Sequence, residues 1–169
     1  MTYTAAVITV SDKGARGERV DTAGPAVAQL LARKGIEVRQ TAIVPDEREE
    51  IAELLEALAD GGEDLIVTTG GTGLAPRDVT PEATLDVIDR EVRGLAELMR
   101  EVGRRSTPMA ALSRGVVGSR GRTLIVNLPG SERGARESLE AVLDLLPHAL
   151  ELLKGDQVEI HPVGGGKEP

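Results

Sequence analysis

Residues 64–73 read Asp-Leu-Ile-Val-Thr-Thr-Gly-Gly-Thr-Gly, an apolar run that leads directly into a glycine-rich loop. The run lacks the alternation of apolar and polar residues that a half-exposed strand shows, which favours a central strand buried on both faces. Two further runs, residues 5–10 and 123–128, have the same character, whereas Glu37 to Val44 alternates more and is expected nearer an edge. Together these runs predict a sheet with a buried centre.

Amphipathic segments lie between these strands. Their apolar residues recur at helical spacing, so each stripe is expected to face the sheet. The four stripes are Ala23, Val27, Leu30 and Leu31; Ile51, Leu54, Leu55 and Leu58; Leu95, Leu98, Met99 and Val102; and Leu139, Val142, Leu143 and Leu146. Thr80-Pro81 predicts a further helix start, with Thr80 as the N-cap. The alternating order of strands and helices predicts parallel crossovers.

One antiparallel strand is expected in addition. Val116 to Leu128 contains a Gly-Ser-Arg-Gly turn, residues 118–121, between two β-capable runs, which predicts a hairpin. The fold class is therefore α/β, with a mostly parallel, mixed sheet and helices on both faces. We expect a single domain over residues 1–155 and a C-terminal extension over residues 156–169, whose end has nothing to bury and is expected to be flexible.

The composition of this 169-residue chain excludes several classes of function. The net charge is −8 and no long stretch of Lys and Arg offsets it, so nucleic acid is not an expected partner. The absence of cysteine excludes disulfides, thiolate metal sites and a cysteine nucleophile. The apolar runs are too short to cross a bilayer and no positively charged region precedes them, which predicts no membrane association and a cytoplasmic location.

Polar or glycine-rich residues follow each of the four strands. They are Ser11 to Gly14, Pro45 to Glu47, Thr69 to Gly73 and Pro129 to Ser131. Because ligands of open α/β sheets bind outside the carboxyl ends of the strands, these segments predict one site. The three glycines of residues 70–73 allow the backbone to approach an anion, although the loop matches neither a P-loop nor a dinucleotide fingerprint. The alternative is a tight turn without a ligand.

Two aspartates stand beside these loops. Asp46 precedes a helical stripe, so an N-cap is its alternative role, and Asp78 has an Asx-turn or a surface ion pair as alternatives. If both carboxylates point into the cleft they can hold a divalent cation, while Arg77 and Lys13 neutralise phosphate oxygens. This combination favours phosphoryl transfer.

Further polar residues follow later in the chain. Ser131 starts a helix, where its hydroxyl is an N-cap, part of an anion site, or both. Ser113 and Arg114 precede the predicted hairpin with no structural role visible in the sequence, and a solvated turn is the alternative for the arginine.

Five motifs, taken in order and with their spacing, resemble the MogA/MoaB family of molybdopterin adenylyltransferases over roughly residues 4 to 154. They are Ile8 to Lys13, Val44 to Glu47, Thr68 to Gly73 continued by Arg77 to Thr84, Ala111 to Arg114, and Asn127 to Ser131. The resemblance implies a three-layer α/β/α fold, usually trimeric, that acts in molybdenum cofactor biosynthesis. The implied reaction transfers AMP from ATP to the terminal phosphate of molybdopterin, with magnesium as cofactor and pyrophosphate as product.

The resemblance also implies roles for individual residues, with Asp46 and Asp78 as the catalytic pair. Nucleotide binding is carried over to Ser11, Asp12, Thr69, Gly70, Gly71, Thr72 and Gly73. Substrate binding is carried over to Arg77, Ser113, Arg114, Pro129, Gly130 and Ser131. The metal ligands stay undetermined.

Two other functions remain open. Molybdopterin molybdotransferases contain a domain of this fold, but they are multidomain chains that are expected to be longer, and a hand-off of product to such an enzyme is an expected partnership. A non-catalytic paralogue that binds molybdopterin or a nucleotide, or serves as a scaffold, would use the same loops.

Overall fold

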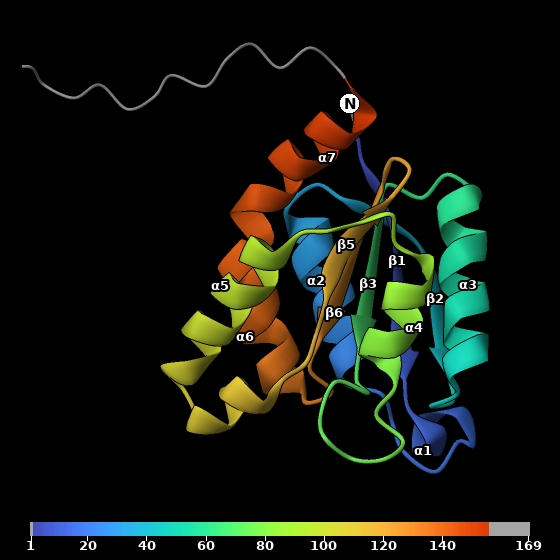
Figure 1. The fold of residues 1–169 in the computed structure, drawn as a ribbon, viewed down its shortest axis with the longest axis vertical. Coiled ribbons are helices and arrows are strands. Elements are labelled where there is room, and N and C mark those ends of the chain that lie inside the picture. The colour runs from blue at the N-terminus through green and yellow to red at the C-terminus, as the bar shows by residue number, and fades with distance from the viewer. Residues whose placement is uncertain (1, 156–169) are drawn as a thin grey trace, which may run out of the picture.

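The computed structural model describes residues 2–155, and the expected C-terminal extension, residues 156–169, lies outside the described residues (Figure 1). The strands are β1 Thr4–Val10, β2 Glu37–Val44, β3 Leu65–Thr69, β4 Arg90–Glu91, β5 Val117–Arg120 and β6 Thr123–Leu128. The α-helices are α1 Asp12–Ala15, α2 Ala23–Arg33, α3 Arg48–Asp60, α4 Thr80–Val87, α5 Arg93–Arg104, α6 Glu132–Val142 and α7 Leu146–Lys154. Two short 3₁₀ helices are η1 Pro108–Leu112 and η2 Leu143–Leu145.

The strands form one six-stranded sheet in the order β2-β1-β3-β6-β5-β4. β1 pairs in parallel with β2 and β3, and β3 pairs in parallel with β6. β5 is antiparallel to both β6 and β4. The prediction of a mostly parallel, mixed sheet in an α/β fold is therefore confirmed, and β2 lies at an edge as expected.

Successive residues of each central strand pack on opposite faces of the sheet. Ala5 and Val7 belong to a core shared with α2, α5, α6 and α7, whereas Ala6 and Ile8 belong to a second core shared with α3 and α4. Figure 1 shows α3 and α4 on one side of the sheet and α5 and α6 on the other. Burial on both faces explains why β1, β3 and β6 carry continuous apolar runs and why the molecule has three layers.

Two local predictions are wrong. Thr80 is the first residue of α4, not its N-cap, because Val79 takes the cap position and the Thr80 hydroxyl donates to the Gly70 carbonyl at 2.9 Å. The hairpin turn lies at residues 121–122, not 118–121. Gly118 lies within β5 opposite Glu91 of β4, and a Cβ there would lie 2.8 Å from the Arg90 carbonyl oxygen, so the glycine serves the close packing of β4 and not the turn.

Across residues 2–155, no helix has both the length and the apolar character needed to cross a membrane.

Candidate active site

The carboxyl ends of four parallel strands meet at one edge of the sheet. The Ser11 amide donates to the Val44 carbonyl at 2.9 Å, and the Gly70 amide donates to the Leu128 carbonyl at 3.0 Å. β2 follows β1 on one side of it in the sheet, and the chain then returns to place β3 on the other side of β1. The crevice between β1 and β3 is therefore a topological switch point. Such points are where α/β sheets bind ligands.

Two cavities open at this edge and share a wall. The first, the strand-end cavity, has a volume of about 430 Å³ and lies between the ends of β1 and β3 and residues 19–23. The second, the η1 cavity, has a volume of about 410 Å³ and lies between the glycine loop, η1 and the start of α6. Both are lined by Gly71, Asp78, Gly130 and Ser131. Two ligands bound in these cavities would therefore meet at those four residues.

The glycine loop separates the two cavities. Gly70 and Gly71 have φ values of +92° and +70°, a left-handed conformation that side chains disfavour. A Cβ at Gly70 would overlap the Val10 carbonyl oxygen, and a Cβ at Gly71 would overlap the Thr80 hydroxyl. The glycines are therefore required by the tight turn, which was the alternative role considered for them. Without side chains at these positions, the backbone itself also lines both cavities.

Asp12 and Asp46 form reciprocal hydrogen bonds at this edge of the sheet. The Asp12 amide donates to the Asp46 carboxylate at 2.9 Å, and the Asp46 amide donates to the Asp12 carboxylate at 3.0 Å. Asp46 is not the N-cap of α3, because Glu47 takes that position. The reciprocal bonds tie the end of β1 to the end of β2 and aim the Asp46 side chain at the strand-end cavity, which it lines.

The two carboxyls have opposite electrostatic environments. Burial raises the pKa of Asp46 above its ordinary value of 3.8, and the charges of Asp12 and Asp78 add to the rise, although the bond from the Asp12 amide opposes it. The hydrogen bonds from Arg77 and from the Asp46 amide lower the pKa of Asp12 to about 2. Asp46 is therefore the carboxylate that most needs a cation.

Asp78 lies at the end of the loop between β3 and α4 and stabilises it with its side chain. Its carboxylate accepts a hydrogen bond from the Ala75 amide at 3.0 Å, which is neither the Asx-turn nor the surface ion pair weighed above. Because Asp78 lines both cavities, its charge acts on any ligand at the shared wall.

Arg77 is engaged by acidic side chains of the neighbouring loops. It donates twice to Asp12, at 2.6 and 3.0 Å, and once to Glu47, at 2.8 Å. The side chain is 57% exposed and lines neither cavity, so the structure places it as a bridge across the edge of the site.

The remaining predicted site residues divide between the cavities. Ser11, Thr69 and Gly70 line the strand-end cavity, whereas Thr72, Gly73, Ser113 and Pro129 line the η1 cavity. The Ser131 hydroxyl accepts from the Gly134 amide at 3.0 Å and so caps α6 while it lines both cavities. Asp12 and Arg114 line neither cavity, and Asp12 is tied to the site by its hydrogen bonds with Asp46 and Arg77.

Sequence reasoning missed Asp21, which lines the strand-end cavity. The Thr9 hydroxyl donates to its carboxylate at 2.6 Å, and the Gly24 amide donates to its other oxygen at 3.0 Å. Asp21 lies two residues before the first residue of α2, Ala23, and next to its cap residue Thr22, and an aspartate at the start of a helix is a signal that the sequence did contain. It also missed Thr107, Met109 and Leu112, which line the η1 cavity from a 3₁₀ helix that apolar periodicity does not reveal.

Comparison with known proteins shows the family of this chain. Residues 6–148 match the family model described as a probable molybdopterin binding domain. The crystal structure of the molybdopterin biosynthesis enzyme MoaB from Thermus thermophilus superposes with a TM-score of 0.87 and 62% identity over 91% of this chain and 98% of that one. The chain belongs to the MogA/MoaB family.

Curated members of the MogA/MoaB family differ in length. The molybdopterin adenylyltransferase of Helicobacter pylori is 39% identical over 158 residues, which are 92% of this chain and 90% of that protein. The molybdenum cofactor synthesis protein cinnamon of Drosophila melanogaster is 42% identical, but this chain spans only 26% of its length. The resemblance found in the sequence is thus confirmed. The matching region makes up most of the Helicobacter pylori protein but only a part of the longer Drosophila protein.

Proposed function

We propose that this chain transfers AMP from ATP to the terminal phosphate of molybdopterin and releases pyrophosphate. The observation that carries the proposal is the pair of cavities that share Gly71, Asp78, Gly130 and Ser131. Each volume lies in the range of small-molecule sites. Relatives named molybdopterin adenylyltransferase, of which this chain covers 88 to 90% in Helicobacter pylori and Escherichia coli, support the same reaction.

The strand-end cavity is proposed to hold ATP and the η1 cavity to hold the pterin. The predicted nucleotide-binding residues Ser11, Thr69 and Gly70 line the first. Exposed Met109 and Leu112 give the second an apolar wall against which a flat pterin ring packs. The phosphates of both substrates then reach the shared wall, where the N-terminus of α6 adds the positive end of a helix dipole.

The reaction needs no nucleophile from the protein. An oxygen of the molybdopterin phosphate attacks the α-phosphorus of ATP, a new P–O bond forms, and the bond to the β-phosphate oxygen breaks with pyrophosphate as the leaving group. Both reactants are anions, so the protein must hold them in line and offset their repulsion. The glycine-loop backbone and the capped start of α6 are placed for this task.

Magnesium fits the donor set of the site. Asp46 and Asp78 come from different loops, and burial together with the nearby charges of Asp12 and Asp78 raises the pKa of Asp46, so a cation beside it would be favourable. Within residues 2–155 no group of three or more His, Cys, Asp or Glu side chains forms a metal site on its own. That suits Mg²⁺, which binds through one or two carboxylates plus substrate phosphates and neutralises their charge.

A direct assay separates catalysis from binding. Purified protein is incubated anaerobically with molybdopterin, ATP and magnesium, and pyrophosphate and adenylylated pterin are measured together. We expect equal amounts of both products. Saturable binding of ATP and molybdopterin without either product would contradict the proposal and favour a non-catalytic paralogue.

Three expectations stay predictions: a homotrimer and a hand-off of product to a molybdotransferase, which follow from the family resemblance, and a cytoplasmic location, which follows from the short apolar runs. The mass of the protein in solution, measured by light scattering, tests the first.

A further inference from the structure

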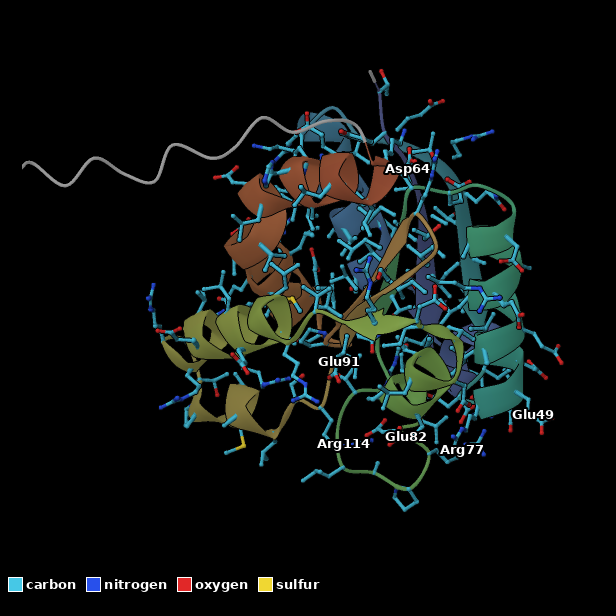
Figure 2. All side chains as sticks on the ribbon, turned by 45° about the horizontal axis from the view of Figure 1, so that its top comes forward. Glu49, Asp64, Arg77, Glu82, Glu91 and Arg114 are labelled. Carbon is cyan, nitrogen blue, oxygen red and sulfur yellow. The ribbon has the colours of Figure 1, made fainter. Side chains whose placement is uncertain are left out.

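Arg114 was expected to bind substrate, but its donors face the protein. Its amide donates to the Thr72 carbonyl, its Nε to the Gly73 carbonyl and its Nη2 to the Asp78 carbonyl, each at 2.8 Å. Its Nη1 pairs with the Glu82 carboxylate. Figure 2 shows Arg114 and Glu82 next to each other beside the loop between β3 and α4. Every nitrogen of the guanidinium therefore has a partner within the chain.

The three carbonyls belong to both ends of one loop. Thr72 and Gly73 start the segment that leaves the glycine turn, and Asp78 ends it, while Leu74 between them is 67% exposed. Arg114 itself lies between η1 and β5, so its side chain fastens the two ends of the loop to a different part of the fold. The loop thus gains a fixed path that its own exposed residues do not provide.

The charge of Arg114 is balanced where it lies. Its side chain is 35% exposed and that of Glu82 is 34% exposed, and one Glu82 carboxylate oxygen is buried without a hydrogen-bond partner among the described residues. Arg114 also lines neither cavity. A guanidinium whose charge is paired and which lies outside both cavities is poorly suited to bind a substrate phosphate.

We propose that Arg114 is a positioning residue that fixes residues 72–78, and with them the Asp78 carboxylate at the shared wall, and that it does not bind substrate. The kinetic consequence rests on the proposed function, whereas the consequence for the loop does not. Only the planar fork of an arginine meets two carbonyls and a carboxylate at once, since a lysine carries the same charge on a single nitrogen.

The decisive comparison is between Arg114→Lys and Arg114→Gln. Positioning through the fork predicts that both variants lose kcat to a similar extent, on the order of a hundredfold, because a misplaced catalytic group costs about that much. The KM values for ATP and molybdopterin should stay within about threefold. Arg93→Gln, which removes an exposed arginine that pairs with Glu91, is the control and should change neither.

Hydrogen exchange gives a readout that needs no catalysis. The amides of residues 72–75 and 77–79 should exchange faster in both Arg114 variants than in the wild type and in Arg93→Gln. If Arg114→Gln folds poorly because it strands the Glu82 carboxylate, the double variant with Glu82→Gln removes that charge and carries the test.

Two results would overturn the proposal. One is a lysine variant with wild-type kcat beside a glutamine variant with a raised KM for molybdopterin, because that pattern marks a charge that binds substrate. The other is unchanged exchange of residues 72–75 and 77–79 in Arg114→Lys. If the wild type makes no adenylylated pterin, the proposed function fails, and the exchange measurement still decides the role of Arg114.

Discussion

The two edges of the sheet, at the amino and carboxyl ends of the parallel strands, differ in the charged side chains beside their cavities. At the amino ends of β3 and β6 lies a cavity of about 750 Å³, larger than either cavity of the candidate site. Two of its cations are paired there: Arg120 with Glu56 and Asp60, and Lys154 with Asp64. At the carboxyl edge, by contrast, burial and neighbouring carboxylates raise the pKa of Asp46. Volume alone does not mark the site, whereas a raised carboxyl pKa at the edge where the strand ends and the glycine loop meet is one sign of it.

The largest effect should separate Asp78 at one edge from Asp89 at the other. Each carboxylate accepts one backbone amide, from Ala75 at 3.0 Å and from Gly121 at 2.7 Å, and an asparagine can still accept that bond. Asp78→Asn should lower kcat for pyrophosphate release on the order of a hundredfold or more, because in the proposed function Asp78, and not Asp89, faces the phosphates. Asp89→Asn should leave kcat unchanged, and urea denaturation should show losses below about 1.5 kcal/mol in both. Equal kcat values for the two variants would remove the distinction between the edges.

Two glycines sharpen the comparison. An alanine at Gly121, where φ is +54°, meets no atom within 4 Å, so only the backbone conformation is strained, at about 1 to 2 kcal/mol. An alanine at Gly71, where φ is +70°, also overlaps the Thr80 hydroxyl. Gly71→Ala should therefore cost more, about 3 kcal/mol in urea denaturation, and should abolish ATP binding measured by calorimetry. Normal ATP affinity in a folded Gly71→Ala variant would contradict a ligand role for the loop.

The opposite pKa shifts of Asp46 and Asp12 give opposite stability effects. Because the folded-state pKa of Asp46 lies above 3.8, its contribution is favourable below that value and is lost as the pH rises through the folded pKa. The folded-state pKa of Asp12 is about 2, so its contribution is present above 3.8 and is lost as the pH falls towards 2.

Asp46→Asn should accordingly raise the free energy of unfolding at pH 7, and Asp12→Asn should lower it, with both differences smaller at pH 3. Urea denaturation of the two variants and the wild type at both pH values measures this. A loss of stability in Asp46→Asn at pH 7 would show that its carboxylate is already compensated in the folded protein.

The smallest effects should come from the arginines that bridge each edge. Arg77→Gln and Arg120→Gln each remove surface ion pairs and should cost about 1 kcal/mol or less. Only Arg77→Gln leaves Asp12 and Glu47 uncompensated beside the strand-end cavity, so it alone should raise the KM for ATP, by a few-fold and most at low salt. A similar rise in Arg120→Gln would point to a long-range change of net charge instead.

The sequence predicted β1, β2, β3, β5 and β6 but not the two-residue strand β4, and the incorrect or missing predictions have physical causes. β1, β3 and β6 were predictable because burial on both faces demands continuous apolar runs. Thr80 was misassigned because its partner, the Gly70 carbonyl, is reached only through the tertiary fold. Periodicity cannot report such contacts.

The same limit applies to the site residues. Asp46 and Asp78 were proposed as site residues because they follow strands and loops. No local sequence pattern predicts the hydrogen bond from the Asp12 amide to Asp46 or the wall that the two cavities share. The position of Arg114 before the hairpin showed no role, and only the family resemblance connected Arg114 with the site. Its partners, three carbonyls and a glutamate, become visible only when the loop is folded.

The central claim is that two ligands bind side by side and meet at Asp78. The most direct measurement is a crystal structure of the chain with molybdopterin, magnesium and an ATP analogue whose bond between the α- and β-phosphates cannot be broken. We expect the nucleotide in the strand-end cavity, the pterin in the η1 cavity, and their phosphates at Gly71, Asp78, Gly130 and Ser131. Both ligands competing for one cavity, or a nucleotide bound at the amino edge of the sheet, would contradict the claim.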